Sequence, residues 1–401
     1  MGTKSNTDAT EVRPYHDTHI WLCFAFFAKN LSPDVIAQLG GVASRCRVLE
    51  SVLLPPELST ELHRIYLAKG VHGTTAIEGN ALSEKEVRSR IESAIPPLES
   101  KKYATQEVDN IIKACNLITS NLVDGTWSPR LSVERIKQFN SLVLHALPQR
   151  DERIVPGEIR TYDVGVFDYS APKSRYCVEL LETLCNWINS YFPFDDAKHP
   201  IANAIVKAIV CHVYIAWIHP FGDGNGRTAR LLEFNLLIAA GVPSVAAHLL
   251  SNHYNQTRPN YLAELSQASK SGGDLGPFLG YAIQGLQDGL AEQFTQIETH
   301  QADTAWRDYV FSLFRNETGP TSKRRRLLAL TLKADTPTAR RNILELSPEL
   351  VAMYVRKTPK TLSRDLKALE DMKLIGRQGT SYFAARSTLN AFKPLTRNRD
   401  A

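Results

Sequence analysis

The sequence predicts a mainly α-helical protein, in which a helical core that carries a short β-hairpin is followed by a C-terminal winged-helix domain. Apolar residues recur at helical spacing from about residue 41 to residue 300. A short stretch that is rich in Val, Tyr and Phe and punctuated by Gly and Pro interrupts this pattern. A chain of 401 residues exceeds one compact core. We therefore expect an N-terminal arm at 1–40 that is partly disordered, a helical domain at 41–300, and a linker with a winged helix at 301–395.

The composition is that of a soluble globular protein, with 43% hydrophobic and 22% charged residues. A net charge of +5 and a pI near 8.8 suit nucleotide or nucleic-acid partners without demanding them. The six cysteines are scattered and form no C-x-x-C pair. Reduced thiols in a cytoplasmic protein explain that distribution better than a disulfide framework or a zinc site.

The N-terminal region combines a polar start with one apolar run. Residues 1–17 are polar and are expected to be disordered. The run IWLCFAFFA at 20–28 is short, whereas a membrane span needs roughly 20 residues. It also follows a segment that contains acidic residues, unlike a signal peptide. We interpret this run as a buried helix or strand of the arm and expect no membrane association.

Helix signals follow one another in the first half of the core. The segment 55–70 has Pro at its start and Gly at its end. Ser83 to Glu86 form a capping box that opens the next helix. Amphipathic patterns then predict helices at 106–125 and 131–147.

The second half of the core contains a break and two strongly apolar helices. Glycine and proline punctuate the segment 156–176, which predicts a hairpin or extended flap. Helices are expected at about 176–191 and 200–218, and the second of these should lie in the middle of a bundle because it is apolar on several faces. Another apolar helix, 227–241, ends at a glycine. A polar, glycine-rich loop thus joins two buried helices.

The C-terminal region predicts a helix-turn-helix followed by a hairpin. Ser347 and Thr358 are N-cap residues, and each is followed by Pro at the first helical position. The second helix, Pro359–Met372, leads into a small hairpin, which completes the winged-helix plan. Its outward surface is basic but contains Asp365, so its ligand could be DNA or a protein. We interpret the basic run 323–326 as a solvated helix face.

The most informative segment is HPFGDGNGRTAR at 219–230. Its G-N-G core precedes a helix N-terminus, where glycines allow close backbone approach and successive N–H groups bind an anion. We place Arg227 and Arg230 in the first helical turn, on one face. Arginines there oppose the helix dipole and need a local anion, such as a di- or triphosphate.

Other side chains of the loop suit chemistry on a nucleotide. Asp223 places a carboxylate beside the phosphates, as expected for a Mg²⁺ ion shared with the substrate. His219 titrates in the range of a base near neutral pH, and Phe221 anchors the loop in the core. The implied reaction is in-line attack by a hydroxyl on a nucleotide phosphorus, with pyrophosphate as leaving group. A lone histidine or G-x-G would be a weak signal, but the combination is specific.

The run matches the signature HxFx(D/E)GNGRxxR at every fixed position, and from about residue 41 to 290 the chain resembles the Fic family. The resemblance implies an all-α core that transfers AMP from ATP to Ser, Thr or Tyr hydroxyls of proteins. It implies that His219 is the catalytic base and that Asp223 holds Mg²⁺. The flap at 162–175 would align a target segment by main-chain contacts. The residues that would bind ATP are Gly222, Gly224, Asn225, Gly226, Arg227 at the β- or adjacent phosphate, Arg230 at the γ-phosphate and Tyr261 near adenine.

A second segment, GTTAIEGNALS at 73–83, resembles the inhibitory motif (S/T)xxxE(G/N) of the same family, with Thr74, Glu78 and Gly79 at its positions. Glu78 paired with Arg230 would neutralise the arginine that should hold the γ-phosphate. ATP could still bind, but with its phosphates misplaced. The plainer alternative is a helix end with a surface glutamate and a glycine cap. The resemblance implies inhibition in cis, without a separate antitoxin.

The leading hypothesis is a cytoplasmic, autoinhibited protein adenylyltransferase that uses ATP and Mg²⁺. Two alternatives stay open. The same site could remove AMP from a modified protein, with Glu78 positioning water, or the chain could be an ATP-sensing DNA-binding regulator. The expected partners are an unidentified target protein, the chain itself through self-modification, a second copy in a homodimer, and DNA or protein at the winged helix.

Overall fold

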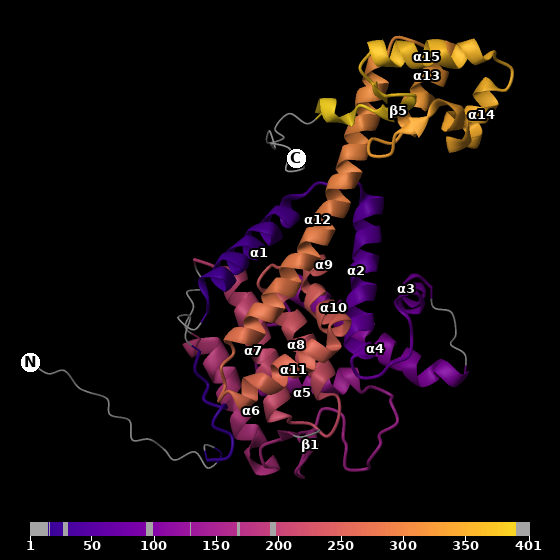
Figure 1. The fold of residues 1–401 in the computed structure, drawn as a ribbon. Helices are drawn as coiled ribbons and strands as arrows, with labels where there is room; N and C mark the ends of the chain where they lie inside the picture. The colour runs from indigo at the N-terminus through magenta and orange to yellow at the C-terminus, as the bar shows by residue number, and fades with distance from the viewer. Residues whose placement is uncertain are drawn as a thin grey trace, which may run out of the picture. The chain divides into compact units, whose positions relative to one another are not determined.

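The computed structural model describes residues 15, 17–26, 31–93, 99–128, 130–166, 169–192 and 198–389. The chain forms two compact units, Met1–Glu292 and Gln293–Ala401, and each is mainly helical (Figure 1). The division lies within the long helix α12 (Gly276–Leu313), as does the expected border near residue 300. Most of the expected disorder at 1–17 falls outside the described residues.

The first unit is a bundle of helices around one central pair. Its helices are α1 (Pro33–Ser51), α2 (Pro56–Ala76), α3 (Glu84–Glu92), α4 (Lys102–Val123), α5 (Val133–Val143), α6 (Cys177–Asn186), α7 (Pro200–Ile218), α8 (Asn225–Ala239), α9 (Ser244–Ala247), α10 (Leu249–Gln256), α11 (Arg258–Lys270) and the start of α12. Short 3₁₀ segments occupy Glu99–Lys101 and Ser174–Tyr176, and a π-helical turn follows α6 at Trp187–Tyr191.

Helices α7 and α8 form the centre of this bundle (Figure 1). Nearly every side chain of α7 is buried, as the apolar pattern of 200–218 predicted. By length and composition alone α7 could cross a membrane, but 83% of its apolar window is buried inside the fold, as in the core helix of a soluble protein. The loop between α7 and α8 therefore connects two helices whose positions are fixed by close packing.

Helix α2 is longer than the sequence pattern predicted. The capping box at Ser83 and Glu86 is present at the start of α3, so that part of the prediction is confirmed. The predicted stop at Gly70 is wrong, because α2 continues to Ala76. Glycine is needed inside this helix for close packing: a Cβ on Gly73 would lie 2.5 Å from the backbone oxygen of Ser251 on α10. The extra turn brings the end of α2 to Arg230 on α8, whose Nη2 donates to the carbonyl of Thr74 at 3.0 Å.

The N-terminal arm is not a regular element where the structure describes it. The expected helix or strand at 20–28 is absent from residues 20–26, although Leu22, Phe24 and Phe26 are buried in alternation. In residues 20–26 alternate side chains pack into the core, although the backbone does not form a strand. Helix α1 already begins at Pro33, inside the range assigned to the arm.

The cysteines are all free, as their spacing predicted. Five are buried and only Cys23 is exposed. Burial raises the pKa of Cys46 and of Cys115 to about 12, so these thiols stay protonated and unreactive at neutral pH.

The predicted flap contains a short antiparallel hairpin, formed by β1 (Gly165–Val166) and β2 (Tyr169–Ser170). The hydroxyl of Tyr169 donates a hydrogen bond of 2.7 Å to the carbonyl of Trp217 at the end of α7. From the other side, a ring nitrogen of His19 lies 2.9 Å from the carbonyl of Ser170. The flap is thus attached to both the central helix and the N-terminal arm.

The second unit begins within α12, at Gln293, and also contains three further helices and a small sheet. These are α13 (Pro320–Thr331), α14 (Pro348–Tyr354) and α15 (Pro359–Asp371), with β3 (Thr338–Ala339), β4 (Ile375–Gln378) and β5 (Ser381–Ala384). The 3₁₀ segments Arg340–Leu346 and Arg386–Leu389 complete it. Helices α14 and α15 and the hairpin β4–β5 appear in the expected order. The sheet is antiparallel in the order β3-β5-β4, so β3 was not predicted.

Two expectations for charged residues in this unit are wrong. Asp365 is not part of the outward basic surface of α15, because its carboxylate is buried and accepts hydrogen bonds from Arg324 at 2.6 Å, Arg325 at 2.9 Å and Tyr354 at 3.0 Å. The basic run 323–326 is likewise not simply a solvated face, since Arg324 is buried against Asp365. A buried carboxylate needs charge partners, and the basic run supplies them.

Candidate active site

The loop at 219–230 begins with a histidine in a strained conformation. His219 ends α7 with φ 47° and ψ 57°, the left-handed region that residues with a Cβ rarely adopt. The following Pro220 disfavours right-handed helical geometry at His219, so the chain leaves the helix abruptly. Strain of this kind persists only where the surroundings fix it, and it concentrates at functional sites.

Arg160, from the flap segment, supplies much of that fixation. Its side chain is fully buried and donates to the carbonyl of His219 at 2.8 Å, that of Tyr162 at 2.8 Å and that of Pro172 at 2.5 Å. Its backbone N–H donates to the carbonyl of Pro220 at 2.9 Å. One guanidinium therefore joins the loop to both ends of the flap.

Two asparagines shape the rest of the loop. The side chain of Asn225 closes the loop on itself, because its amide accepts from Phe221 N and donates to Phe221 O, both at 2.9 Å. Asn140 on α5 donates to the carbonyl of Asp223 at 2.9 Å and accepts from Gly157 N at 2.9 Å. Asn225 can therefore contribute to a phosphate site through its backbone, while its side chain holds the loop.

Helix α8 begins at Asn225, two residues before the predicted start. Gly224 is the N-cap with φ 76°, and the N–H groups of the first turn face the loop. Arg227 lies in the first turn, but Arg230 lies in the second, so its placement in the first turn was wrong. Both side chains are buried, and they face the open N-terminal end of α8 from one side of the helix.

Arg230 is bonded to the segment that resembles an inhibitory motif. Its Nη2 donates to Glu78 Oε1 at 2.5 Å and to the carbonyl of Thr74 at 3.0 Å. A Cβ on Gly226 would contact Glu78 Oε1, so a side chain at this position would displace the carboxylate from where it now lies. The expected meeting of Glu78 with Arg230 is present in the structure.

The carboxylate of Glu78 is charged in this position. Desolvation raises its pKa, but the charge and hydrogen bond of Arg230, with smaller contributions from Arg227 and His219, outweigh desolvation and leave the pKa of Glu78 below its ordinary value. The side chain still keeps 36% of its surface exposed. The turn that carries it is held from outside, because Arg258 Nε donates to the carbonyl of Ile77 at 3.0 Å.

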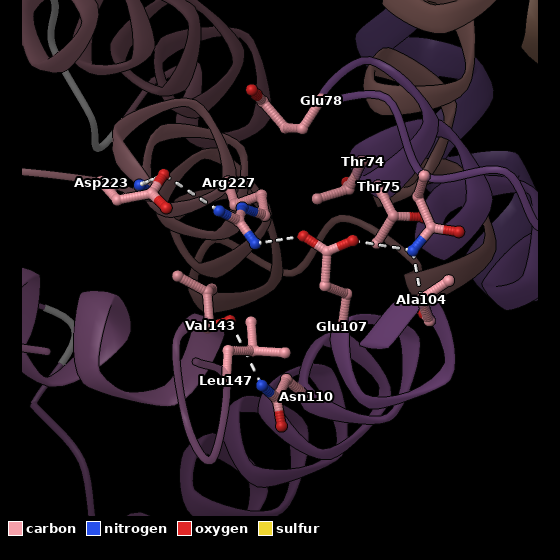
Figure 2. Close-up of polar contacts among 12 residues, drawn as sticks. Thr74, Thr75, Glu78, Ala104, Glu107, Asn110, Val143, Leu147, Asp223 and Arg227 are labelled. Atoms are coloured by element: carbon pink, nitrogen blue, oxygen red, sulfur yellow. Dashed lines mark hydrogen bonds and ion pairs between the residues drawn. The ribbon is translucent and has the colours of Figure 1, made fainter. Parts of the chain in front are cut away.

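Arg227 lies between two carboxylates. Nη1 donates to Glu107 Oε1 on α4 at 2.5 Å, and Nη2 donates to Asp223 Oδ1 at 3.2 Å (Figure 2). Glu107 also accepts from the side-chain amide of Asn80 at 2.8 Å. Burial raises the pKa of Glu107 above its ordinary value, although Arg227 and Asn80 act in the opposite direction.

Asp223 is the residue that is expected to bind Mg²⁺, and its surroundings show whether such an ion would fit. No group of three or more His, Cys, Asp or Glu that could hold a metal occurs in the part of the chain that is described. Mg²⁺ in nucleotide sites needs only one or two protein carboxylates, because the phosphates and water complete its shell. The side chain of Asp223 is 31% exposed beside the N-terminus of α8, so its donor chemistry and its access fit such an ion.

His219 is a neutral imidazole in this environment. Desolvation lowers its pKa to about 4, although the carboxylates of Glu78 and Asp223 and the carbonyl of Ala216 raise it in part. Nδ1 lies 3.4 Å from the carbonyl of Ala216. In the tautomer whose Nδ1 donates to that oxygen, Nε2 carries a free lone pair and can accept a proton.

Tyr261, which the family resemblance placed near adenine, is fully buried behind Arg230. Its hydroxyl oxygen lies 2.9 Å from Nε2 of His212 and accepts a hydrogen bond from the Arg230 guanidinium. His212 in turn contacts Glu233, whose carboxylate accepts from Tyr254 at 2.9 Å. In this structure Tyr261 supports the arginine from within the core.

Sequence reasoning missed several residues that build the site. Arg160, Asn140, Glu107 and Asn80 all make contacts with partners far along the chain, for example 120 residues apart for the pair of Glu107 and Arg227. One local signal was available for Glu107, a carboxylate on the apolar face of an amphipathic helix next to Val108 and Ile111. A charge on a buried face requires a partner.

Comparisons with known proteins agree with this geometry. Residues 130–237 match the Fic/DOC family model. "Protein adenylyltransferase fic-1" from Caenorhabditis elegans is 30% identical over 216 residues, which are 53% of this chain and 38% of that protein. "Protein adenylyltransferase Fic" from Nematostella vectensis is 29% identical over 215 residues, 53% of this chain and 45% of that protein. The chain therefore spans less than half the length of these curated relatives.

Solved structures show the same fold. A Fic family protein from Desulfovibrio desulfuricans G20 superposes with a TM-score of 0.54 at 18% identity, covering 88% of this chain and 96% of that one. Fic-1 from C. elegans superposes with a TM-score of 0.53 at 26% identity, covering 66% of this chain and 73% of that one. The helical bundle and its central loop have the fold of these Fic proteins, and residues 130–237 are the part of the chain that matches the Fic/DOC family model.

Proposed function

We propose that this protein is an adenylyltransferase that transfers AMP from ATP to hydroxyl groups of proteins, including its own chain, and that Glu78 holds it in an inhibited state. The observation that carries this proposal is the junction of α7 and α8, where neutral His219 stands beside a helix N-terminus that presents two buried arginines. An anion nest, two cations and a base lie within twelve consecutive residues there. Relatives named protein adenylyltransferases support the same activity.

His219 acts as general base in the proposed reaction. Its Nε2 accepts the proton of the attacking Ser, Thr or Tyr hydroxyl, and that oxygen forms a bond to the α-phosphorus while the bond to pyrophosphate breaks. The N-terminus of α8, Arg227 and Arg230 hold the leaving phosphates in line. The flap, anchored through Arg160 and Tyr169, aligns the target segment beside His219.

Asp223 would hold a Mg²⁺ ion together with the phosphates of ATP. When bound, that ion offsets the negative charge of the phosphates. The contribution of the protein is the position of the carboxylate, which the hydrogen bond from Arg227 and the contact of Asn140 with the Asp223 carbonyl restrict.

Inhibition follows because Glu78 occupies the guanidinium of Arg230, which would otherwise bind a phosphate of ATP. With Glu78 Oε1 at 2.5 Å, the guanidinium cannot also give a bidentate contact to a γ-phosphate in the same place. The negative charge of Glu78 also repels the phosphates directly. ATP bound in this state would have its terminal phosphate displaced and its α-phosphorus out of line with the attacking hydroxyl.

The test uses ATP labelled at the α-phosphate, with Mg²⁺, on the full chain alone and in a cell lysate. Glu78→Gly should incorporate more AMP than the wild type, and Glu78→Gly with His219→Ala should incorporate none. Absence of label with every variant would refute the transferase proposal. Equal labelling of Glu78→Gly and wild type would refute inhibition by Glu78 while leaving the transferase proposal intact.

The reverse reaction is a second candidate because Glu78 stays charged and partly exposed within the site. A charged carboxylate there can position a water molecule for attack on a protein-bound AMP. Self-labelled Glu78→Gly protein serves as substrate for added wild-type protein and for added Glu78→Gly/His219→Ala protein. Loss of AMP only with wild-type protein supports removal as a second activity, and equal retention in both mixtures argues against it.

A further inference from the structure

We propose that Glu107 is a positioning residue that fixes Arg227 for phosphate binding and, through Asn80, couples the inhibitory turn at Thr75–Asn80 to the nucleotide site. This inference rests on the proposed function and concerns the same site. Figure 2 shows Glu107 with one carboxylate oxygen toward Arg227 and the other toward the turn. The two oxygens thus bond two structural elements, helix α8 and the turn at Thr75–Asn80.

The first step concerns how firmly Glu107 is bound. Its side chain is 6% exposed, and that of Arg227 is 5% exposed. Arg227 is the cation that contacts Glu107 in the described structure. Removing a cation from a buried carboxylate is strongly unfavourable. Arg227 therefore stays with Glu107 when a nucleotide enters, and does not exchange Glu107 for phosphate.

The second step concerns the donors that Arg227 has left. A guanidinium has five N–H groups, and the bonds to Glu107 and Asp223 use one on each Nη. Its Nε is buried and has no hydrogen-bond partner among the described residues. A buried donor without a partner is costly, and a phosphate oxygen would satisfy it or one of the remaining Nη donors. Glu107 thus orients a cation that keeps free donors for an anion.

The third step concerns Asn80, which ends the turn that carries Glu78. Its side-chain amide donates to Glu107 Oε2 and to the carbonyl of Ala104, both at 2.8 Å. Its backbone N–H donates to the carbonyl of Thr75 at 3.2 Å, which closes the turn. These bonds tie the end of the turn to α4 and so hold the Glu78 side chain toward Arg230. Losing them should loosen the turn and weaken inhibition.

The first test measures binding without catalysis. Calorimetry with α,β-methylene-ATP, which cannot transfer AMP, and with AMP is carried out on Glu78→Gly in the presence of Mg²⁺. Adding Glu107→Gln should weaken binding of the triphosphate about tenfold, equivalent to ~1.4 kcal/mol, and leave AMP binding nearly unchanged. Unchanged or tighter triphosphate binding would overturn the positioning role, the latter because Glu107 would then be a competitor for Arg227.

A matched control lies on the same helix. Asp109 on α4 pairs with Arg90 through two bonds of 2.7 Å, away from the loop. Asp109→Asn removes a carboxylate from an Arg pair in the same way as Glu107→Gln, and should leave both affinities unchanged. If Asp109→Asn weakens triphosphate binding as much as Glu107→Gln does, the effect is general to α4 and the inference fails.

The second test measures AMP transfer in two backgrounds. Asn80→Ala should raise the activity of the wild type several-fold but should not raise that of Glu78→Gly, because the turn has no inhibitory carboxylate left to hold. A merely structural defect would lower both activities, and that result would overturn the coupling. As control, Asn189→Ala removes an asparagine that bonds the backbone of Leu131 and should not activate the wild type. If Glu78→Gly binds the analogue but transfers no AMP, the proposed function fails while the binding test of Glu107 still stands.

Discussion

Glu78 and Arg230 are joined by a 2.5 Å hydrogen bond between a carboxylate and a fully buried guanidinium that also donates to the Thr74 carbonyl. The residue that carries the carboxylate and the residue that supplies the carbonyl are one helical turn apart. Arg230 therefore binds this segment in two ways, through an ion pair with Glu78 and through a hydrogen bond to the backbone carbonyl of Thr74. Removing the charge alone should release only part of the inhibition.

The first prediction compares Glu78→Gln with Glu78→Gly. The glutamine keeps the size and one hydrogen-bond acceptor but loses the charge–charge attraction and the repulsion of phosphates. We expect AMP transfer by Glu78→Gln to lie between those of wild type and Glu78→Gly, with the glycine variant on the order of tenfold or more above wild type, a difference of ~1.4 kcal/mol per tenfold step. Initial rates of label incorporation measure this order. A glutamine variant as active as the glycine variant would show that charge is the whole effect.

The second prediction concerns acid. Because Arg230 keeps the pKa of Glu78 below its ordinary value, the carboxylate remains charged at every pH above that range. Mild acidification should therefore not relieve inhibition, and the activity ratio of Glu78→Gly to wild type should stay constant between about pH 5.5 and 8. Parallel pH series of both proteins give this ratio. A ratio that falls toward one as the pH drops to 5.5 would show that Glu78 becomes protonated there.

The third prediction concerns the base. Burial lowers the pKa of His219 to about 4, so the imidazole is neutral well below pH 6.5. In Glu78→Gly the pKa of His219 should fall further, because a nearby negative charge that raises it is gone. The acid limb of kcat/KM for AMP transfer, which reports the free enzyme, should therefore lie below about pH 5 and not near the ordinary histidine value of ~6.5. An acid limb near pH 6.5 would contradict this assignment.

The sequence was informative where neighbouring residues cooperate. The capping box at Ser83 and the buried pattern of α7 are local, and both predictions are confirmed. The order of residues from His219 to Arg230 is also local, and the structure places it between two buried helices as expected. Glu78 and Arg230 lie 152 residues apart, and their pairing was expected only because two family motifs were matched.

Other features depended on packing that no local pattern records. The extra turn of α2 exists because Gly73 fits against the backbone of α10, whereas a glycine in sequence suggests a helix end. Nothing in the local sequence distinguishes Arg160 from a surface arginine. In the folded protein its guanidinium donates to four backbone carbonyls, which come from the flap and from the end of α7. Asp365 falls on the apolar side of α15 by register, but the three donors that make this tolerable come from α13 and α14.

The fourth prediction tests Arg160. Its replacement by Met keeps the apolar bulk but leaves buried carbonyls of His219 and Pro172 without donors. Each unsatisfied buried acceptor costs about 1–3 kcal/mol, so the free energy of unfolding should fall by roughly 2–4 kcal/mol. Since the strained conformation of His219 loses its support, AMP transfer in the Glu78→Gly background should fall more than Tm alone explains. Urea denaturation and transfer rates at a temperature where the variant is folded measure the two effects, and full activity in the folded variant would contradict the positioning of His219 by Arg160.

The fifth prediction concerns the C-terminal unit. Desolvation raises the pKa of Asp365, but hydrogen bonds from Arg324, Arg325 and Tyr354 outweigh it and leave the pKa below its ordinary value. A carboxyl group whose pKa is lower in the folded than in the unfolded state contributes stability that is complete above the unfolded pKa of ~3.9 and is lost as the pH falls through the folded pKa. Asp365→Asn should therefore destabilise this unit by about 3 kcal/mol at pH 7, because Arg324 is left buried without its partner, and should remove the corresponding loss of stability in acid. Hydrogen exchange of α13 and α15 in the full chain measures the change, with α7 as internal reference. Unchanged protection of α13 and α15 at pH 7 would show that the arginines gain other partners or water and that the buried cluster contributes no net stability.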